Sequence, residues 1–289
     1  MTEINEQIDL ETERVTSTIK LHIFRHGAKL VAKGMPDHET PLSDFGREQA
    51  REKSTSKDIS QSIAFGNPRI RTQETASLVM GGELNSINGS ETLSDLRTKI
   101  DNGLNVGSKI RVDERLDIHD PDTDEYDDQF FEAAKSSRYL EFLFKESDMA
   151  AEKFGDKKAD TYSRMASQVA LIIQKYLNIA PRWDKLANDD KKRYQNTLER
   201  FFSTHGGIGE SFLGKVIELT KGIKERDRFA EALKMQGFDF LEGFDIEIMN
   251  YGGQDSEIRI VFQKDYAENT VFNFNEKISP IILQKILGS

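Results

Sequence analysis

Short apolar segments alternate with helical segments along this chain, and this alternation predicts an α/β fold. Leu21, Ile23 and Phe24 supply the apolar side chains of a compact strand over residues 20–24, which leads directly into Arg25-His26-Gly27. We expect further short strands at 62–65, 109–112 and 200–203. Strands separated by helices usually form a largely parallel sheet with helices on both faces, which is a three-layer α/β/α sandwich.

Helix-capping signals mark the beginnings of the first two helices. Ser43 is placed as the N-cap of a polar helix over residues 44–57. Asn67-Pro68 supplies an N-cap and a first-turn proline for a second helix, which we expect to end at Gly81-Gly82. Residues 83–108 carry clusters of Asn, Gly and Ser, and we expect an elaborated loop there.

The later part of the chain divides into a helical block and a short antiparallel region. We expect the clearest helices of the block near 129–145 and 160–177. Alternating apolar residues at 244–250 and 258–263 predict an antiparallel hairpin, and a last helix is expected at 279–287.

The length of 289 residues suits one large domain or two small ones. Residues 1–18 are polar, and we expect them to form a solvated arm or a short leader helix. Residues 19–289 are then a single α/β domain, with a helical insertion at about 117–197 that caps the site. The first 20 residues show no signal-peptide core, so we expect a cytoplasmic protein.

The composition excludes several classes of function. The chain has no cysteine, which rules out disulfide scaffolds, thiolate metal sites, iron–sulfur clusters and cysteine nucleophiles. Its formal net charge of −10, from 50 acidic and 40 basic side chains, argues against binding along a nucleic-acid backbone. No apolar run approaches the length of a membrane span. We therefore expect neither a nucleic-acid nor a membrane partner, and the oligomeric state stays open.

Two of the five histidines, His26 and His205, follow an apolar strand and precede a glycine. Ligands of open α/β sheets bind at this carboxyl edge of the strands, and glycine lets a ligand approach the backbone closely. Arg25 adjoins the first histidine, and Arg71 lies at the start of the second helix. Two guanidinium groups suit a phosphate dianion, and a neutral imidazole can attack phosphorus directly. This set predicts a small phosphorylated substrate and requires no metal or other cofactor.

Four short motifs, LHIFRHG at 21–27, PLSDFGREQA at 41–50, NPRIRTQETA at 67–76 and STHGG at 203–207, occur in this order. Together they resemble the motifs of the histidine phosphatase superfamily, which contains the cofactor-dependent phosphoglycerate mutases. The last motif, in which glycine follows His205, resembles the late histidine–glycine segment of the first branch of that superfamily. The resemblance implies a phosphoglycerate mutase-like fold and a phosphomonoesterase similar to the histidine acid phosphatases.

Residue by residue, the resemblance implies His26 as the nucleophile and His205 as a second catalytic histidine. It implies that the phosphate is bound by Arg25, Arg71, His205 and Gly206. Arg69, two residues before Arg71, is the competing candidate for the second arginine.

The proton donor of the superfamily follows the third strand, and Glu114 fits that place best in this sequence. Asp113 and Asp117 are its alternatives. A positioned carboxylic acid is needed there because an alkoxide leaving group must gain a proton as it departs.

The residues after the first motif differ from those of true mutases. Lys29 stands where many members have threonine, and residues 28–36 lack the tryptophan and asparagine that follow this motif in mutases. The difference favours a metal-independent phosphatase that acts through a phosphohistidine. A phosphotransferase of the phosphoglycerate mutase type and a catalytically weak module that binds a phosphorylated ligand are the alternatives.

The segment 113–128 is strongly acidic, but its spacing does not match a calcium-binding loop. Glu125 occupies the position that requires glycine, and Phe131 stands where a bidentate glutamate belongs. We expect a solvated acidic lid, which near the mouth of the site would disfavour polyanionic substrates. His22 alternates with apolar strand residues and is expected to be a hydrogen-bonded histidine at the face of the sheet.

Overall fold

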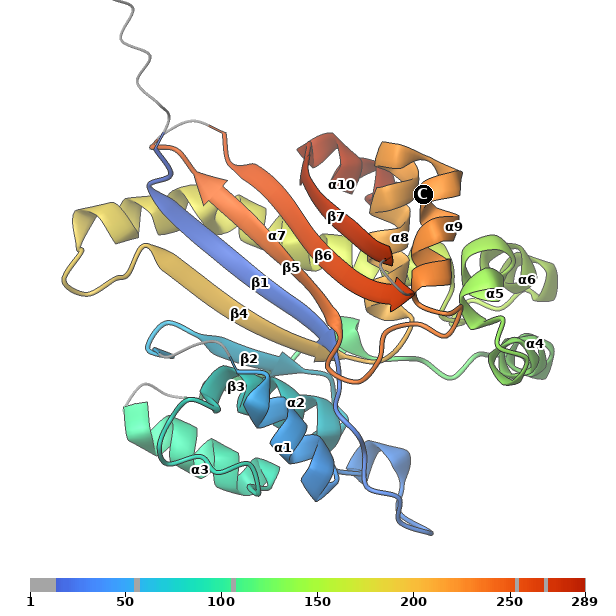
Figure 1. Ribbon diagram of the computed structural model, residues 1–289, viewed down its shortest axis with the longest axis horizontal. Coiled ribbons are helices and arrows are strands. Elements are labelled where there is room, and N and C mark those ends of the chain that lie inside the picture. The colour runs from blue at the N-terminus through green and yellow to red at the C-terminus, as the bar shows by residue number, and fades with distance from the viewer. Residues whose placement is uncertain (1–13, 55–57, 105–107, 253–254, 268–269, 289) are drawn as a thin grey trace, which may run out of the picture.

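The computed structural model describes residues 14–54, 58–104, 108–252, 255–267 and 270–288, which contain one seven-stranded mixed sheet (Figure 1). The strands are β1 Ser17–Arg25, β2 Ile63–Gly66, β3 Ile110–Val112, β4 Thr197–Thr204, β5 Gly243–Asn250, β6 Glu257–Ala267 and β7 Thr270–Ile278. Their order across the sheet is β3-β2-β4-β1-β5-β6-β7. The first four strands in this order are parallel, and β5, β6 and β7 add antiparallel neighbours. The predicted strands and the β5–β6 hairpin are confirmed.

Helices cover both faces of this sheet. Within the described ranges they are α1 Asp44–Glu52, α2 Ile70–Gly81, α3 Leu93–Leu104, α4 Asp124–Lys135, α5 Tyr139–Lys145, α6 Ser147–Phe154, α7 Tyr162–Asp189, α8 Ile208–Lys221, α9 Ile223–Ala232 and α10 Pro280–Leu287. On one face α1, α2 and α3 pack on a core that includes Phe24 and Phe201. On the other, α7, α8 and α10 pack on a core that includes Ile23 and Phe202. Adjacent strand residues thus face opposite cores, which confirms the three-layer α/β/α architecture.

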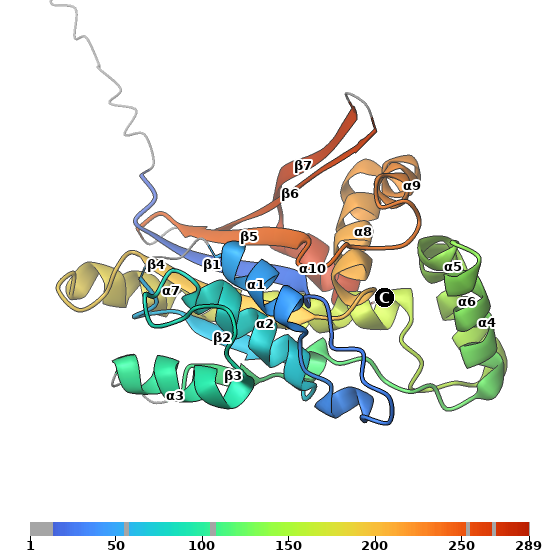
Figure 2. The same cartoon turned by 60° about the horizontal axis from the view of Figure 1, so that its bottom comes forward.

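The helices α4, α5 and α6 stand apart from these two layers. Both views show them beyond the end of the sheet at which β1 and β4 finish (Figures 1 and 2). The sequence predicted one helix over 129–145, but Ser137 has a left-handed backbone with φ of 59°, and the chain turns there between α4 and α5. The second predicted helix, α7, continues to Asp189, and its residue Trp183 is buried in the core.

The prediction of a loop over 83–108 is wrong, because α3 occupies part of this segment. Leu96 and Ile100, four residues apart, are fully buried against α2. The signal for this helix is a capping box: the Thr92 amide donates to Asp95, and the Asp95 amide donates to the Thr92 hydroxyl. The strand β7 was also not predicted, although alternate residues Phe272 and Phe274 point into the core.

The two predicted N-caps have different outcomes. Ser43 caps α1 as predicted, since its hydroxyl accepts a hydrogen bond from the Gly46 amide at 3.1 Å, although the helix ends at Glu52. Asn67 does not cap α2, whose N-cap is Arg69. Instead, the Asn67 side chain accepts from the Arg69 amide at 2.9 Å and organises the turn that precedes the helix.

The start of the predicted arm, residues 1–13, lies outside the described residues, and β1 begins at Ser17. The segment assigned to the cap, 117–197, contains α4, α5, α6 and α7. Among the described residues, no helix combines the length and the apolar character that are needed to cross a membrane.

His22 is hydrogen-bonded at the face of the sheet, as predicted. Its Nδ1 lies 2.8 Å from Asp245 on β5, its Nε2 lies 3.6 Å from Glu199 on β4, and its ring stacks on Phe201. Burial lowers the pKa of His22, but the two carboxylates outweigh burial and raise the pKa to about 9. The protonated ring of His22 therefore connects β1 with β4 and β5 at the centre of the sheet.

Replacing His22 with glutamine should cost stability in a pH-dependent way. The folded pKa of about 9 exceeds the ordinary value of 6.5, so the stabilisation is complete below pH 6.5 and is lost as pH rises through 9. We expect His22→Gln to lower the free energy of unfolding by about 2 kcal/mol at pH 6 and by much less at pH 10. Urea unfolding at both pH values measures this, and the exposed His38→Gln serves as control. An equal loss at both pH values would contradict a charged His22.

Candidate active site

The parallel pairing of β1 and β4 brings the two strand-end histidines together. Arg25 pairs with Thr204 in this register, so the next residues, His26 and His205, leave the sheet side by side. Their ring centroids lie 4.9 Å apart, with 72° between the ring planes. Both side chains are buried, with 6% and 5% of their surface exposed. The fold thus places the two histidines at the edge of the sheet where the sequence predicted them.

His26 is held as a neutral imidazole with one unprotonated nitrogen. Its Nδ1 lies 2.7 Å from the Gly27 carbonyl, which can only accept a hydrogen bond, so Nδ1 carries the proton. Nε2 is then the nitrogen with the lone pair, and it accepts a hydrogen bond from Arg71 Nε at 3.4 Å. Burial, together with the charges of Arg71 and Arg25, lowers the pKa of His26 to about 3. An unprotonated Nε2 beside a guanidinium is the state that a nucleophile requires.

His205 lies across from His26 and is also kept neutral. Burial, followed by the effects of His26 and Arg71, holds the pKa of His205 well below its ordinary value. Its Nε2 is buried without a hydrogen-bond partner among the described residues, and the nearest carboxylate oxygen, on Asp117, is 3.9 Å away. An unpaired buried ring nitrogen is costly, and it can serve a ligand that supplies the missing partner.

Arg25 is fixed by the segment before β5. Its Nη1 donates to the Phe238 carbonyl at 2.5 Å, and its guanidinium lies 4.9 Å from the centre of the Phe240 ring. Its Nε is buried and has no hydrogen-bond partner among the described residues. A Cβ placed on Gly206 would lie 3.7 Å from this Nε, so the predicted phosphate-binding glycine lies beside the guanidinium.

Arg71 projects from the first turn of α2 and is already bound to a carboxylate. Its Nη1 donates to the Asp37 backbone carbonyl at 2.6 Å, and its Nη2 donates to the Asp37 side chain at 2.8 Å. Asp37 begins η1, Asp37–Glu39, in the loop between β1 and α1. An anionic group from the chain itself therefore occupies the guanidinium that was predicted to hold phosphate.

Asp37 gathers two further cations, which the sequence analysis did not connect. Lys29 Nζ donates to its carboxylate at 2.9 Å, and Arg69 Nη1 binds it as well. Burial raises the pKa of Asp37, but Arg71 and Lys29 lower it much more, so this carboxyl group stays ionised. Arg69 and Arg71 are thus not alternatives, because both reach the same anion.

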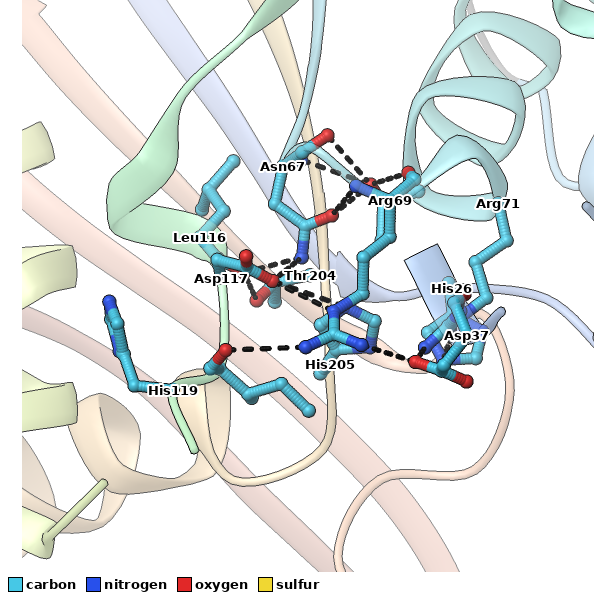
Figure 3. A network of polar contacts seen from close by, with 12 residues as sticks. His26, Asp37, Asn67, Arg69, Arg71, Leu116, Asp117, His119, Thr204 and His205 are labelled. Atoms are coloured by element: carbon cyan, nitrogen blue, oxygen red, sulfur yellow. Dashed lines mark hydrogen bonds and ion pairs between the residues drawn. The ribbon is translucent and has the colours of Figure 1, made fainter. Parts of the chain in front are cut away.

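The structure places Asp117, not Glu114, among these groups. Glu114 begins the short turn η2, Glu114–Leu116, where its side chain is exposed and joins no other described residue through a hydrogen bond or ion pair. The predicted donor thus projects into solvent. Asp117 accepts from Arg69 Nε and from Asn67 Nδ2, both at 2.9 Å, and faces His205 (Figure 3). The side chain of Asp113, the other alternative, binds Arg115.

Backbone contacts hold the turn that carries Asp117. The Leu116 carbonyl accepts from Thr204 Oγ1 at 2.9 Å and from Asn67 Nδ2 at 3.1 Å (Figure 3). Asn67 therefore links the end of β2, Arg69 before α2, and this turn. A helix-cap signal in the sequence turns out to mark a residue that positions the polar groups of the site.

Glu210 supports the Arg25 side of the site and was missed by the sequence analysis. Its carboxylate is fully buried and accepts from the Gly207 amide at 2.9 Å and from the Phe238 amide at 2.7 Å. Phe238 in turn supplies the carbonyl that binds Arg25. Gly207 has φ of +99°, and a Cβ there would come within 2.2 Å of the Tyr139 hydroxyl, so only glycine fits. The sequence signal that could have predicted the role of Glu210 is Gly207, a glycine three residues before an acidic residue of the helix.

The acidic segment supplies no metal site. Among the residues that the structure describes, no group of three or more histidine, aspartate or glutamate side chains could hold a metal ion. His119 is instead paired with Asp160 at 3.0 Å.

Several known structures are similar to this fold, whereas no protein-family model and no curated protein matches the sequence. A mycobacterial hydrolase is 13% identical, over 94% of this chain and 97% of that chain, with a TM-score of 0.46. A mycobacterial glucosyl-3-phosphoglycerate phosphatase is 14% identical, over 80% and 91%, with a TM-score of 0.46. A phosphoserine phosphatase from Entamoeba histolytica, in complex with phosphoserine, is 14% identical, over 92% and 99%, with a TM-score of 0.40. Values this low do not transfer an activity, so the chemistry below rests on the residues of this chain.

Removing the charge of Asp37 should strengthen phosphate binding. A phosphate that binds Arg71 must displace the Asp37 carboxylate, and hydrogen bonds to charged groups contribute about 1.5–3 kcal/mol. We expect Asp37→Asn to lower the Kd for inorganic phosphate roughly tenfold or more, measured by titration calorimetry at constant pH. The exposed Asp44→Asn, on α1, provides a matched charge control. An unchanged or higher Kd in Asp37→Asn would show that Asp37 does not compete with the anion.

Proposed function

We propose that this protein is a phosphomonoesterase of the histidine phosphatase type, which transfers the phosphoryl group to His26 and then to water. The observation that carries the proposal is the neutral, buried imidazole of His26, whose unprotonated Nε2 lies next to Arg71 and faces His205. Cationic or polar groups surround the place where a phosphoryl group in line with Nε2 would lie. The motif resemblance supports the same reaction, and no step of it calls for a metal ion.

In the first step, Nε2 forms a bond to phosphorus while the bond from phosphorus to the alcohol oxygen breaks. Nδ1 keeps its proton, and the Gly27 carbonyl stabilises the positive charge that the phosphorylated ring acquires. Arg25, Arg71 and His205 bind the non-bridging oxygens, whose charge is spread over the transition state. The unpaired Nε of Arg25 and the unpaired Nε2 of His205 become satisfied in this state.

Asp117 is the proposed proton carrier, because its carboxyl group lies beside His205 and the arginines. Its carboxyl group enters the cycle protonated, gives that proton to the departing alcohol oxygen in the first step, and is then a carboxylate. In the second step it takes a proton from water, the water oxygen bonds to phosphorus, and the bond from phosphorus to Nε2 breaks. Inorganic phosphate leaves and the starting state returns.

The covalent intermediate gives the most direct test of this function. Brief reaction with a ³²P-labelled phosphomonoester should leave label on His26, in an acid-labile and base-tolerant form. His26→Ala should lose the label and reduce kcat/KM by roughly 10³-fold or more, since the nucleophile is removed. His38→Gln, which changes an exposed histidine, should still be labelled. Label on serine or aspartate, or undiminished turnover in His26→Ala, would overturn the proposal.

The role of Asp117 is tested by changing the leaving group. General acid catalysis contributes about 10²–10⁴-fold for a poor leaving group, so Asp117→Asn should reduce kcat/KM on an alkyl phosphate by about that factor. A nitrophenolate leaves with little need for a proton, so the loss on p-nitrophenyl phosphate should be much smaller.

The matched control for this experiment is Glu114→Gln, three residues earlier in the chain. Because the Glu114 side chain is exposed and outside the network, we expect both substrates to be hydrolysed within about twofold of the wild-type rate. A selective loss on the alkyl phosphate in Glu114→Gln, with Asp117→Asn unaffected, would restore Glu114 as the donor.

A further inference from the structure

A small cavity opens next to the proposed phosphate position, where the segment from Ile118 to Phe131 faces α5 and α7. Its volume is about 150 Å³, comparable with a cavity that holds one benzene ring. Its lining includes the aromatic residues Phe130, Phe131 and Tyr139, the acidic residues Asp120 and Asp127, and Gly206. Gly206 directly follows His205, and the Ile118 carbonyl accepts from Arg69 at 3.3 Å, so the inner end of the cavity adjoins the catalytic groups.

This position suits the alcohol part of a bound phosphomonoester. Figure 3 shows His119 on the side of Asp117 and His205 that is away from His26. The unpaired Nε2 of His205, which is buried, marks the polar inner end at which the phosphate would lie. An ester with its phosphorus beside His26 and its leaving oxygen beside Asp117 would extend its organic group into this cavity.

Aromatic rings form much of the wall. Phe130 makes edge-to-face contacts with Tyr139 and Phe131, with centroids 5.4 and 5.8 Å apart. Tyr126 also lines the cavity; it is buried and donates its hydroxyl hydrogen to the Asp160 carbonyl at 3.0 Å. Aromatic faces of this kind attract apolar groups and also cations, because the ring face carries negative charge density.

The charges of the lining favour a cation as well. Three carboxylates and one imidazole line the cavity, and no lysine or arginine is among the lining residues. His119 is paired with Asp160, whereas Asp120 and Asp127 form no ion pair with any described residue. Burial and the carboxylates of Asp128, Asp120 and Asp124 raise the pKa of Asp127, so Asp127 lies close to other acidic groups. A carboxylate or a second phosphate on the alcohol would be repelled here.

We propose that the substrate is a compact phosphomonoester whose alcohol carries an ammonium group, bound between the aromatic wall and Asp120 and Asp127. This inference rests on the proposed phosphatase function and adds the chemical class of its substrate. The arginines bind the dianionic phosphate end, and the cavity binds the cationic end. The protein thereby distinguishes such esters from neutral and anionic ones of the same size.

A matched pair of substrates isolates the charge. Phosphocholine and 3,3-dimethylbutyl phosphate have the same shape, but a quaternary nitrogen in the first is a carbon atom in the second. We expect kcat/KM for phosphocholine to exceed that for the neutral ester by at least about tenfold at 0.15 M salt. The anionic 2-carboxyethyl phosphate should be the poorest of the three. Equal or lower kcat/KM for phosphocholine would overturn the inference.

Two double variants assign the preference to the cavity. Asp120→Asn/Asp127→Asn removes the two unpaired lining charges and should reduce the ratio of the two kcat/KM values to about threefold or less. Asp124→Asn/Asp128→Asn removes the same charge from the same segment outside the lining, and should keep the tenfold ratio. A ratio lost equally in both variants would assign the preference to the general field of the segment and contradict the cavity.

Failure of this inference can be told apart from failure of the proposed function. Hydrolysis of p-nitrophenyl phosphate by the wild-type protein tests the function alone, since this substrate carries no cation. The preference is measured independently as the ratio of Kd values for phosphocholine and 3,3-dimethylbutyl phosphate in His26→Ala, by calorimetry. A binding ratio of about ten supports the ligand class whatever the turnover, and a ratio of one overturns it.

Discussion

The hydrogen bond between His26 Nδ1 and the Gly27 carbonyl is the interaction on which the chemistry of this site depends. Because a carbonyl only accepts, the bond fixes the proton on Nδ1 and leaves the lone pair on Nε2. Burial beside Arg71 and Arg25 then keeps the ring from binding a second proton. If the His26 ring were turned over or protonated, the same residues would form a cationic pocket without a nucleophile.

The sheet provides the geometry around this imidazole. The register of β1 against β4 sets His205 beside His26, and the turn before α2 brings Arg69 and Arg71 to the same edge. So many buried cationic and unpaired groups are costly to assemble. In the structure Asp37 offsets part of that cost by binding the arginines, and the proposed substrate replaces it with a dianion. The carboxylate of Asp37 and the proposed substrate therefore bind to the same cluster of cationic groups.

Local sequence signals predicted the parts of the fold that local physics decides. Ser43 caps α1 because its hydroxyl needs only the next turn, and the strand ends at His26 and His205 follow from short apolar runs before glycine. The helix α3 was missed because its Asn, Gly and Ser residues suggested a loop, while burial of Leu96 and Ile100 against α2 decided the outcome. Tertiary packing overrode composition there.

Only the site residues that belong to recognisable motifs could be predicted from the sequence. The two histidines and Arg71 come together as expected, whereas Asp37 has no motif and reaches the site through a loop whose path the sequence does not encode locally. Asp117 and Glu114 are three residues apart, and the path of the η2 turn decides which carboxylate faces His205 and which faces solvent. The distinction depends on contacts from Thr204 and Asn67, which are distant in the sequence.

Nitrogen-15 NMR of the histidine rings tests the central claim most directly, with His26→Ala to assign the resonances. The folded pKa of about 3 lies below the ordinary 6.5, so protons bind preferentially to the unfolded chain between these values and stability falls as pH drops through this window. Between pH 5 and pH 8 the folded ring should remain neutral. We expect His26 to show a protonated Nδ1 and an unprotonated Nε2 that do not change across that range. Titration of His26 near pH 6.5, or a proton on Nε2, would contradict the account.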